Sequence, residues 1–418
     1  MIVYANLVSD LAVDLAQRHV LRAWAELAPR EVWVLRPGDV LVSPVPVGEA
    51  FLRYACGLTG VPPESVAVVV LARAFETVSG CAALPEVVRA VRKASEGRDA
   101  GAVLPTALDA PAVALARGLG VPVAPYPSAE AAEAALGITR SLNTKAVFRN
   151  TAAGLGMRLP DGRVCRREGL ADAMGELLRV HEQVVVKPDR SAGGHGLRFL
   201  SAAAGAASLE DLPAVGGAEG LWVVEERVDV ARAVSIQMVT GPAGPRPVFS
   251  GEMRTLGGTF AGYLSPLPAP LQENGPTLER WGMALGRHLA AHGYAGPFSL
   301  DAMVSAGGEL FAGESNVRRT ATTTPYAMVA RLAANAGASA AAWATGTVRT
   351  PRRYGFDEAV DRLCAERIAY DPARGEGVVL YADVPPDGLT WRYTVIADSH
   401  ASVARYEGLL RASWAPVP

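Results

Sequence analysis

The sequence predicts an α/β protein in which an N-terminal open sheet leads into an antiparallel-rich sheet and then into a small α+β module. Up to about residue 130, short Val-rich runs alternate with helical stretches, which is typical of an open α/β sheet. From Val184 onward, apolar runs are joined by short turns rich in Gly, which indicates antiparallel hairpins. Near the C-terminus, two more strand-like runs precede a final helical segment.

Apolar runs that follow a first strand at Met1–Asn6 predict the rest of the N-terminal sheet. These runs are Glu31–Leu35, Val66–Ala72, Gly101–Leu108 and Gly120–Pro125. The predicted helices of this part are Glu86–Lys93, Ala110–Leu119, Ser128–Leu136 and Asn143–Leu155. The turn after the first strand holds no GxGxxG sequence, so the dinucleotide-binding fingerprint is absent there.

Paired strands and one long helix are predicted in the second part of the chain. The strands are Val184–Pro188, Leu197–Leu200, Leu221–Val228, Val234–Thr240, Pro247–Met253, Phe298–Ser305 and Glu309–Glu314, and the helix is Thr277–His292. Between these elements, Arg254–Pro276 is long, rich in Gly and Pro and without periodicity, so we expect a lid over a reaction site. A solvated surface insertion is the alternative.

The last part is predicted to follow a linker at Ala338–Arg353. Its strands are Gly377–Tyr381 and Leu389–Ala397, and its helix is Ser399–Ser413. The 418 residues are enough for two to four domains at roughly 100–200 residues each. We therefore expect three units, at residues 1–140, 141–337 and 338–418.

The overall charge narrows the class of partner. Forty basic and forty-two acidic residues give a net charge of −2, so no excess charge points to nucleic acid or to an anionic membrane. The longest aliphatic run is far shorter than the roughly 20 residues of a membrane span. Because the chain starts without the basic segment of a signal peptide and its four cysteines form no CxxC pair, we expect a cytoplasmic protein without a zinc framework. The sequence leaves a homodimer open.

Lysine is rare, since only three of the forty basic residues are lysines. Lys93 lies at the predicted solvated end of a helix, so no special role is expected for it. At Lys145 and Lys187 we expect that the site needs a compact ammonium group, which the planar guanidinium of arginine does not replace. Lys187 enters a Gly-rich turn whose members are Ser191, Gly193, Gly194, His195 and Gly196. Such a turn lets backbone N–H groups approach phosphate oxygens, although the sequence is not a P-loop. A plain flexible hairpin tip is an equal alternative.

A second set of polar residues lies on the predicted hairpin over residues 298–316. Glu314 and Asn316 are two positions apart and point to one side of a strand, and a turn at residues 306–308 would bring Asp301 beside them. Two carboxylates and an amide oxygen are ligands suited to Mg²⁺ that carries nucleotide phosphates. A solvated hairpin face is the alternative. Arg318 is expected to stabilise charge on a transferred phosphoryl group, whereas Arg319 is expected at the surface.

In their order along the chain, these pieces resemble the ATP-grasp superfamily. The match covers roughly residues 140–335 and rests on the ordered set rather than on one motif. The set consists of Lys145, Lys187 with the Gly-rich turn, the hinge sequence Glu225-Glu226-Arg227-Val228, and Asp301 with Glu314-Ser315-Asn316.

The resemblance implies roles for these residues. Lys145 and Lys187 would hold the α- and β-phosphates of ATP, and the Gly-rich turn would close over the β- and γ-phosphates. Adenine would meet the hinge backbone at Glu226 and Val228, next to Glu225. Asp301, Glu314 and Asn316 would bind two Mg²⁺ ions, and Arg318 would face an acyl phosphate. Ala233 stands where the family usually has a ribose-binding glutamate, and Asp229 is a candidate substitute.

The flanking parts resemble the peptide ligases of the pheganomycin type, which have a pre-ATP-grasp domain, an ATP-grasp core and a small C-terminal module. That resemblance implies a ligase that joins a carboxylic acid, in this family a nonproteinogenic guanidino acid, to a peptide amine through an acyl phosphate, with release of ADP and phosphate. Two alternatives stay open: an L-amino-acid ligase that uses a free amino acid as acceptor, and a non-catalytic ATP-binding regulatory protein.

Overall fold

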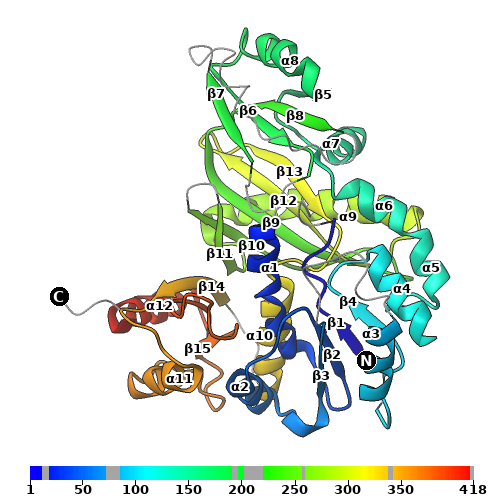
Figure 1. Ribbon diagram of the computed structural model, residues 1–418. Helices are drawn as coiled ribbons and strands as arrows, with labels where there is room; N and C mark the ends of the chain where they lie inside the picture. Colours follow the sequence, from blue (N-terminus) through cyan, green and yellow to red (C-terminus); the bar gives the residue numbers. More distant parts are fainter. Residues whose placement is uncertain are drawn as a thin grey trace.

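The structure is a computed structural model that describes residues 1–11, 18–71, 85–98, 100–190, 196–201, 220–256, 259–337 and 342–414. Figure 1 shows three sheets, with a four-stranded antiparallel sheet at one end, the four-stranded N-terminal sheet at the other and the eight-stranded sheet between them. Every helix in the described part of the chain is too short or too polar to cross a membrane.

The N-terminal sheet is parallel and has the strand order β3-β2-β1-β4. Its strands are β1 (Ile2–Tyr4), β2 (Val40–Ser43), β3 (Ala67–Val70) and β4 (Val103–Pro105). The helices of this part of the chain are α1 (Arg18–Ala25), α2 (Glu49–Thr59), α3 (Pro85–Ala94), α4 (Ala110–Leu119), α5 (Ala129–Ala134) and α6 (Leu136–Leu142), with short 3₁₀ segments at Ala28–Val34 and Pro63–Ser65. Helix α7 (Lys145–Gly154) follows and contacts the strands β8 and β13 of the other two sheets. The carboxylate of Asp109 caps α4 by accepting the Ala112 N–H at 2.9 Å, as sequence rules for helix starts require.

A small antiparallel sheet follows, in the order β5-β8-β6-β7. Its strands are β5 (Gly162–Arg166), β6 (Gln183–Pro188), β7 (Arg198–Ser201) and β8 (Leu221–Glu226). Helix α8 (Leu170–Leu177) covers one face, where alternate residues Val184, Val186 and Val224 are buried. The opposite residues of the same strands, Lys187 and Glu225 among them, therefore lie on the other face.

The largest sheet has eight strands in the order β13-β12-β9-β10-β11-β14-β16-β15. They are β9 (Val230–Thr240), β10 (Arg246–Leu256), β11 (Thr259–Ser265), β12 (Gly296–Ser305), β13 (Leu310–Asn316), β14 (Ala342–Arg349), β15 (Gly377–Leu380) and β16 (Thr390–Ala397). The associated helices are α9 (Gly275–Ala291), α10 (Thr323–Asn335), α11 (Phe356–Ala365) and α12 (His400–Trp414), with a 3₁₀ segment at Ala269–Asn274.

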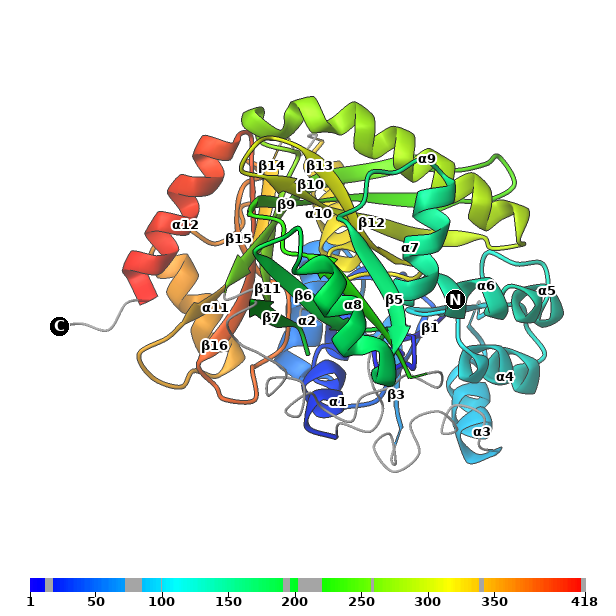
Figure 2. The same ribbon diagram turned by 90° about the horizontal axis from the view of Figure 1, so that it is seen from above.

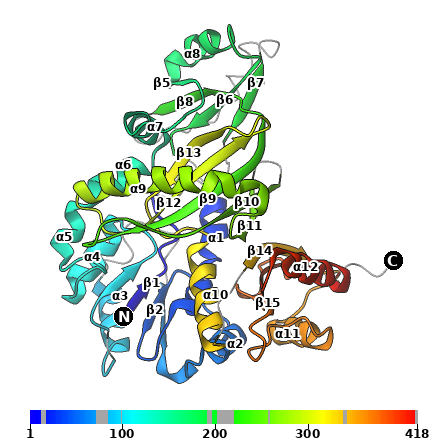
Figure 3. The ribbon, with the colours of Figure 1, turned by 180° about the vertical axis from the view of Figure 1, so that it is seen from behind.

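Helix α9 lies along one face of the large sheet and contacts β9, β10 and β12, as Figures 2 and 3 show. Val234, Ile236 and Leu300 point to this face and are buried in one apolar core with α9. Residues of opposite parity, including Ser235 and Asp301, lie on the other face, which we call the site face. Helix α10 and the N-terminal unit lie on the side of the site face.

Several predicted elements are wrong in the N-terminal unit. Glu31–Leu35, predicted as a strand, lies mostly in the 3₁₀ segment Ala28–Val34, which has Pro29 at its start. A short apolar run does not by itself distinguish a strand from a buried helical turn. The run at Gly120–Pro125 makes only an isolated parallel bridge between Val123 and Val103, and strand β2 was missed.

The predicted lid is also wrong. Arg254–Pro276 contains the end of β10, all of β11 and the 3₁₀ segment before α9. Strand β11 pairs with both β10 and β14, and Tyr263 in its middle is fully buried. This segment therefore joins the two halves of the large sheet, and Gly262 in it serves close packing. A Cβ on Gly262 would lie 2.2 Å from the carbonyl oxygen of Thr345.

The prediction of a linker at Ala338–Arg353 is also wrong, because this segment too contains a strand that is paired on both sides. Half of it is strand β14, which pairs with β11 on one side and β16 on the other. The C-terminal strands thus continue the large sheet. The predicted strands at Gly377–Tyr381 and Leu389–Ala397 agree with β15 and β16 within one residue at each end.

Candidate active site

The hairpin of β12 and β13 places two carboxylates opposite each other. Asp301 pairs with Glu314 across the hairpin, and Ser299 pairs with Asn316. The predicted hairpin is therefore confirmed, with its turn at residues 306–308. Asp301 accepts hydrogen bonds from Ser235 Oγ at 2.6 Å and from Asn316 Nδ2 at 3.0 Å.

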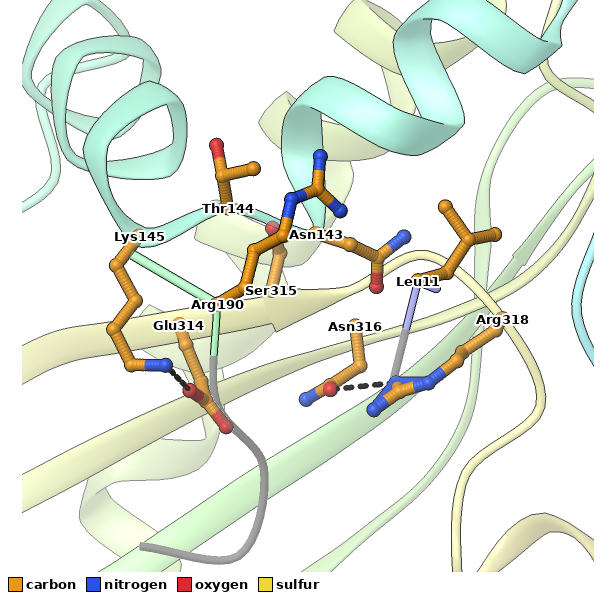
Figure 4. Close-up of a pocket in the computed structure, with 9 residues that line it drawn as sticks. All are labelled: Leu11, Asn143, Thr144, Lys145, Arg190, Glu314, Ser315, Asn316 and Arg318. Carbon is orange, nitrogen blue, oxygen red and sulfur yellow. Dashed lines mark hydrogen bonds and ion pairs between the residues drawn. The ribbon is translucent and has the colours of Figure 1, made fainter. Parts of the chain in front are cut away.

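Two cations face these acidic groups (Figure 4). Lys145 Nζ lies 3.5 Å from Glu314 Oε2, and Arg318 donates to Asn316 Oδ1 at 2.7 Å. Lys145 is the first residue of α7, so the N-terminal end of that helix, with its positive dipole, also points to this region. Burial lowers the pKa of the Arg318 guanidinium, an effect opposed by the charges of Glu314 and Asp301.

The Asp301 carboxyl group is the most perturbed acid of the site. Burial, and then the charge of Glu314, raise the pKa of Asp301 to about 7, against the hydrogen bonds from Ser235 and Ser299. Two carboxylates on paired residues repel each other in a medium that solvates them poorly. The arrangement therefore favours a bound cation at this position.

Glu314, Asn316, Lys145 and Arg318 line one pocket, which Figure 4 shows in close-up. Sequence reasoning had found four of its members: Lys145, Glu314, Asn316 and Arg318. It missed Leu11, Asn143, Thr144, Arg190 and Ser315. The missed residues lie directly beside those that had been identified, or, for Leu11, just after the first strand, and position along the chain was the one signal that would have found them.

Hydrogen bonds between side chains and backbone groups hold the walls of the pocket together. The carboxylate of Asp189, just beyond β6, accepts the Ala146 N–H at 2.8 Å, so the small sheet is tied to the start of α7. Asn143 Oδ1 accepts the Val317 N–H at 3.1 Å, and Ser315 Oγ donates to the Leu142 carbonyl at 2.5 Å. The end of β13 is thereby held against the α6–α7 junction, which sets the distance between Lys145 and Glu314.

Lys187 lies on the open face of the small sheet, where it forms an ion pair with Glu225. Arg149 Nη1 also contacts Glu225, at 2.7 Å, so this buried carboxylate has two cationic partners. Lys187 would have to exchange its carboxylate partner for a phosphate oxygen to bind a nucleotide. Arg149 would then remain to neutralise Glu225.

The other hinge residues have distinct surroundings. Glu226 donates its backbone N–H to the Asp161 carbonyl at 2.8 Å, so adenine would have to use other hinge groups. Val228 is half-buried, and Asp229 is exposed. Of the predicted Gly-rich turn, Ser191, Gly193, Gly194 and His195 lie outside the described residues. Gly196 is described and has a φ of +79°, in the region that favours glycine.

Arg319 corrects another prediction. It was expected at the surface, but its side chain is buried and forms an ion pair with Glu31 at 2.7 Å. The backbone N–H of Arg319 also donates to the Thr106 carbonyl at 2.9 Å. Arg318 and Arg319 are neighbours in the chain, yet one lines the pocket and the other reaches the N-terminal unit.

Comparison with known proteins adds to this geometry. A model of the family described as "Pre ATP-grasp domain" matches residues 28–121, and one described as "PGM1 C-terminal domain" matches residues 358–410. The chain resembles N5-carboxyaminoimidazole ribonucleotide synthetase from Thermus thermophilus, with a TM-score of 0.59 and 19% identity over 100% of this chain and 99% of that one. The chain has the ATP-grasp fold.

Two further ATP-grasp structures are similar over nearly the whole chain. Biotin carboxylase from Campylobacter jejuni, in a complex with β,γ-ATP, gives a TM-score of 0.57 at 15% identity and covers 97% of this chain and 89% of that one. The N5-carboxyaminoimidazole synthase of Aspergillus clavatus, bound to ADP and 5-aminoimidazole ribonucleotide, gives 0.56 at 14% identity over 91% and 99%. A search of curated proteins returns no match.

Within this ATP-grasp fold, the donor set at the β12–β13 hairpin fits Mg²⁺. Asp301 and Glu314 supply hard oxygen ligands, and their mutual repulsion would be relieved by a divalent cation. Asn316 Oδ1 would have to turn from Arg318 to the metal. The described residues contain no group of three His, Cys, Asp or Glu side chains that could hold a metal, so phosphates or water would complete the coordination.

Proposed function

We propose that this protein is an ATP-dependent carboxylate–amine ligase, with the division at residues 1–140, 141–337 and 338–418 as its working units. The observation that carries the proposal is the facing pair Asp301 and Glu314 in an ATP-grasp fold, in which Glu314 lines one pocket together with Lys145 and Arg318. Acidic residues for metal and cationic residues for phosphate are the parts that phosphoryl transfer needs, because positioning and charge neutralisation carry its rate.

In the proposed reaction, a carboxylate oxygen of the donor acid attacks the γ-phosphorus of ATP, and the bond to the β–γ bridging oxygen breaks. The products are an acyl phosphate and ADP. A neutral amine then attacks the acyl carbon, phosphate leaves with the electron pair of the broken C–O bond, and the amine loses a proton to give the amide. Arg318 would stabilise charge on the transferred phosphoryl group, while Lys145 and Lys187 would hold the nucleotide phosphates.

Asp301, Glu314 and Asn316 would hold Mg²⁺, which would supply neutralisation of phosphate charge. Ser191, Gly193, Gly194, His195 and Gly196 are proposed to cover the phosphates, and Glu225, Glu226, Val228 and Asp229 to contact the nucleoside. The buried pair of Glu225 with Arg149 supports this assignment, because it keeps a cation near Glu225 when Lys187 moves to phosphate.

A peptide as the amine substrate, and a guanidino acid as the donor, are the finer form of the proposal. The two matching family models support it, because they lie on the N- and C-terminal parts that flank the core. A free amino acid as acceptor is the alternative that the first experiment tests.

The experiment measures ADP release from ATP with mixtures of carboxylic acids and either dipeptides or free amino acids. A donor labelled with ¹⁸O in its carboxylate is then used, and one ¹⁸O atom is expected in the released phosphate. Formation of AMP and pyrophosphate, or phosphate without ¹⁸O, would contradict the acyl phosphate. ATP binding by calorimetry without ADP release under any condition would favour a regulatory ATP-binding protein.

A further inference from the structure

A second group of buried charges lies where the N-terminal unit meets the C-terminal strands. We call it the arginine cluster and define it as Arg30 and Arg319 beside Glu31, together with Arg392, which acts on Arg30. Arg30, Glu31 and Arg319 are 3%, 0% and 7% exposed. Arg319 Nη2 lies 2.7 Å from Glu31 Oε2, and Arg30 Nε lies 3.9 Å from Glu31 Oε1. Arg392, on β16, acts electrostatically on Arg30.

Sheet register places Arg392 on the site face. Asp301 of β12 pairs with Ser235 of β9. Two positions before Ser235, Ala233 pairs with Met253 of β10, and Met253 pairs in turn with Tyr263 of β11. Tyr263 pairs with Thr345, and Thr345 with Thr394, which is two positions from Arg392. Because residues two apart on a strand share a face, Asp301 and Arg392 belong to the same face at opposite ends of the sheet.

The N-terminal unit approaches this end of the site face directly. Trp33 Nε1, in the same 3₁₀ segment as Arg30, donates to the carbonyl of Tyr381 at 2.9 Å. Tyr381 follows the last residue of β15, whose Leu380 pairs with Tyr393 next to Arg392. The contacts of Trp33 and the strand register therefore support the closeness of Arg30 and Arg392.

The cluster holds more positive than negative charge. Thr324 Oγ1 donates to Glu31 Oε1 at 2.8 Å, whereas Glu31 Oε2 has only the ion pair with Arg319 and no hydrogen bond within the described residues. The charged and titratable groups that act on Arg30 are Glu31, Tyr381, Arg392 and Arg319, so one carboxylate serves three guanidinium groups. Burial lowers the pKa of Arg30, which is the expected cost of a poorly compensated charge.

Unused donors lead to the same conclusion. Arg30 Nε and Arg319 Nη1 are buried and have no hydrogen-bond partner in the described part of the chain. The Arg392 side chain likewise forms no hydrogen bond or ion pair with the residues that the structure describes. Buried charges in proteins are ordinarily paired. A clasp between the two parts of the molecule would need only Arg319 and Glu31.

We infer that the arginine cluster binds a carboxylate that does not react, the C-terminal carboxylate of the peptide that supplies the amine. This inference rests on the proposed ligase function. A guanidinium matches a carboxylate in planar, two-point geometry, and one such ligand would compensate the surplus charge. Arg319 follows Arg318 directly, so a peptide anchored at the cluster has its other end free to extend toward the pocket where Arg318 lies.

The test compares a mixture of Xaa-Ala dipeptides with the same mixture as C-terminal amides, by the thermal shift of the full chain without turnover. We expect the free acids to bind at least about tenfold more tightly than the amides, since a charge-assisted hydrogen bond is lost in the amide. Arg392→Gln should abolish this preference. Arg349→Gln, an exposed arginine on the adjacent strand β14, should keep it.

Arg30→Gln is the second variant, with its unfolding curve recorded beside the binding curve. Equal binding of acids and amides by the unchanged protein, or a preference that survives Arg392→Gln and Arg30→Gln in folded variants, would overturn the inference. Inorganic phosphate that binds at the cluster where the dipeptide acids do not would overturn the assignment to carboxylate. Loss of the proposed ligase function would appear separately, as absent ADP release with intact acid preference.

Discussion

The two ends of the site face carry different arrangements of charge: a facing pair of carboxylates with cations beside it at one end, and several arginines with one carboxylate at the other. At the β13 end, Asp301 and Glu314 face each other, and burial with mutual repulsion raises the pKa of Asp301. At the other end, Arg30 and Arg319 lie beside Glu31, Arg392 of β16 acts on Arg30, and burial lowers the pKa of Arg30. In both places the protein leaves charge incompletely paired, which costs stability. We infer that the two ends suit ligands of opposite sign: a metal ion beside the carboxylates and a carboxylate beside the arginines.

The largest expected effect concerns the acidic end. Glu314→Gln should lower turnover by roughly 10³-fold or more, because the amide keeps the shape but lacks the charge that Mg²⁺ needs. The measurement is ADP release at saturating Mg²⁺, with circular dichroism to verify the fold. Glu309→Gln on the same hairpin is the matched control, since Glu309 is exposed and pairs only with Arg158 among the described residues. An unchanged rate for Glu314→Gln would remove this residue from the site.

The second prediction concerns the arginine cluster, where the expected loss of stability depends on which residue is replaced. Glu31→Gln should lower the free energy of unfolding by about 3–5 kcal/mol, because it leaves buried guanidinium groups without their anion. Arg392→Gln should change it by less than about 1 kcal/mol, since Arg392 has no pair to lose among the described residues. Denaturant unfolding at pH 7 measures both. Similar losses of stability for the two variants would show that Arg392 has an ionic partner in solution. The arginine cluster would then hold no unpaired positive charge.

The third prediction tests the strand that joins the ends. Gly262→Ala should lower the free energy of unfolding by about 1–3 kcal/mol, because its Cβ would meet the backbone oxygen of Thr345 at 2.2 Å. Gly241→Ala, where a Cβ meets nothing within 4 Å, should stay within about 0.5 kcal/mol of the unchanged protein. Equal effects, measured by denaturant unfolding, would indicate that β11 is packed more loosely than the register requires.

The smallest expected effect is on pH dependence. The folded pKa of Asp301 is raised to about 7 from the ordinary 3.8, so the ionised group is worse off in the folded state than in the unfolded state. Its contribution to stability is therefore fully present below pH 3.8 and is lost as the pH rises to about 7.

Unfolding of the unchanged protein and of Asp301→Asn at pH 4.5, 6 and 8 measures this contribution. As the pH rises over this range, the unchanged protein should lose on the order of 2 kcal/mol of stability relative to Asp301→Asn. A difference that stays constant with pH would contradict a raised pKa and, with it, the unbalanced charge at the acidic end.

The sequence alone predicted the parts whose evidence is local. Asp301, Glu314 and Asn316 belong to one hairpin, so strand alternation and a short turn were enough to place them together. Lys145 and Lys187 were singled out because lysine is rare in this chain. Alternation along β6 and β8 also placed Lys187 and Glu225 in strands, although their ion pair follows only from how those strands are paired.

Only the tertiary structure decided the features that depend on residues distant in the chain. Strands β11 and β14 were missed because their glycines face a backbone oxygen or a tyrosine ring, and a glycine chosen for close approach looks like a turn in sequence. The arginine cluster joins Glu31 to Arg319 and Arg30 to Arg392, and so combines three separate parts of the chain. Charge balance in a buried site depends on which groups meet in space, and no local pattern records that.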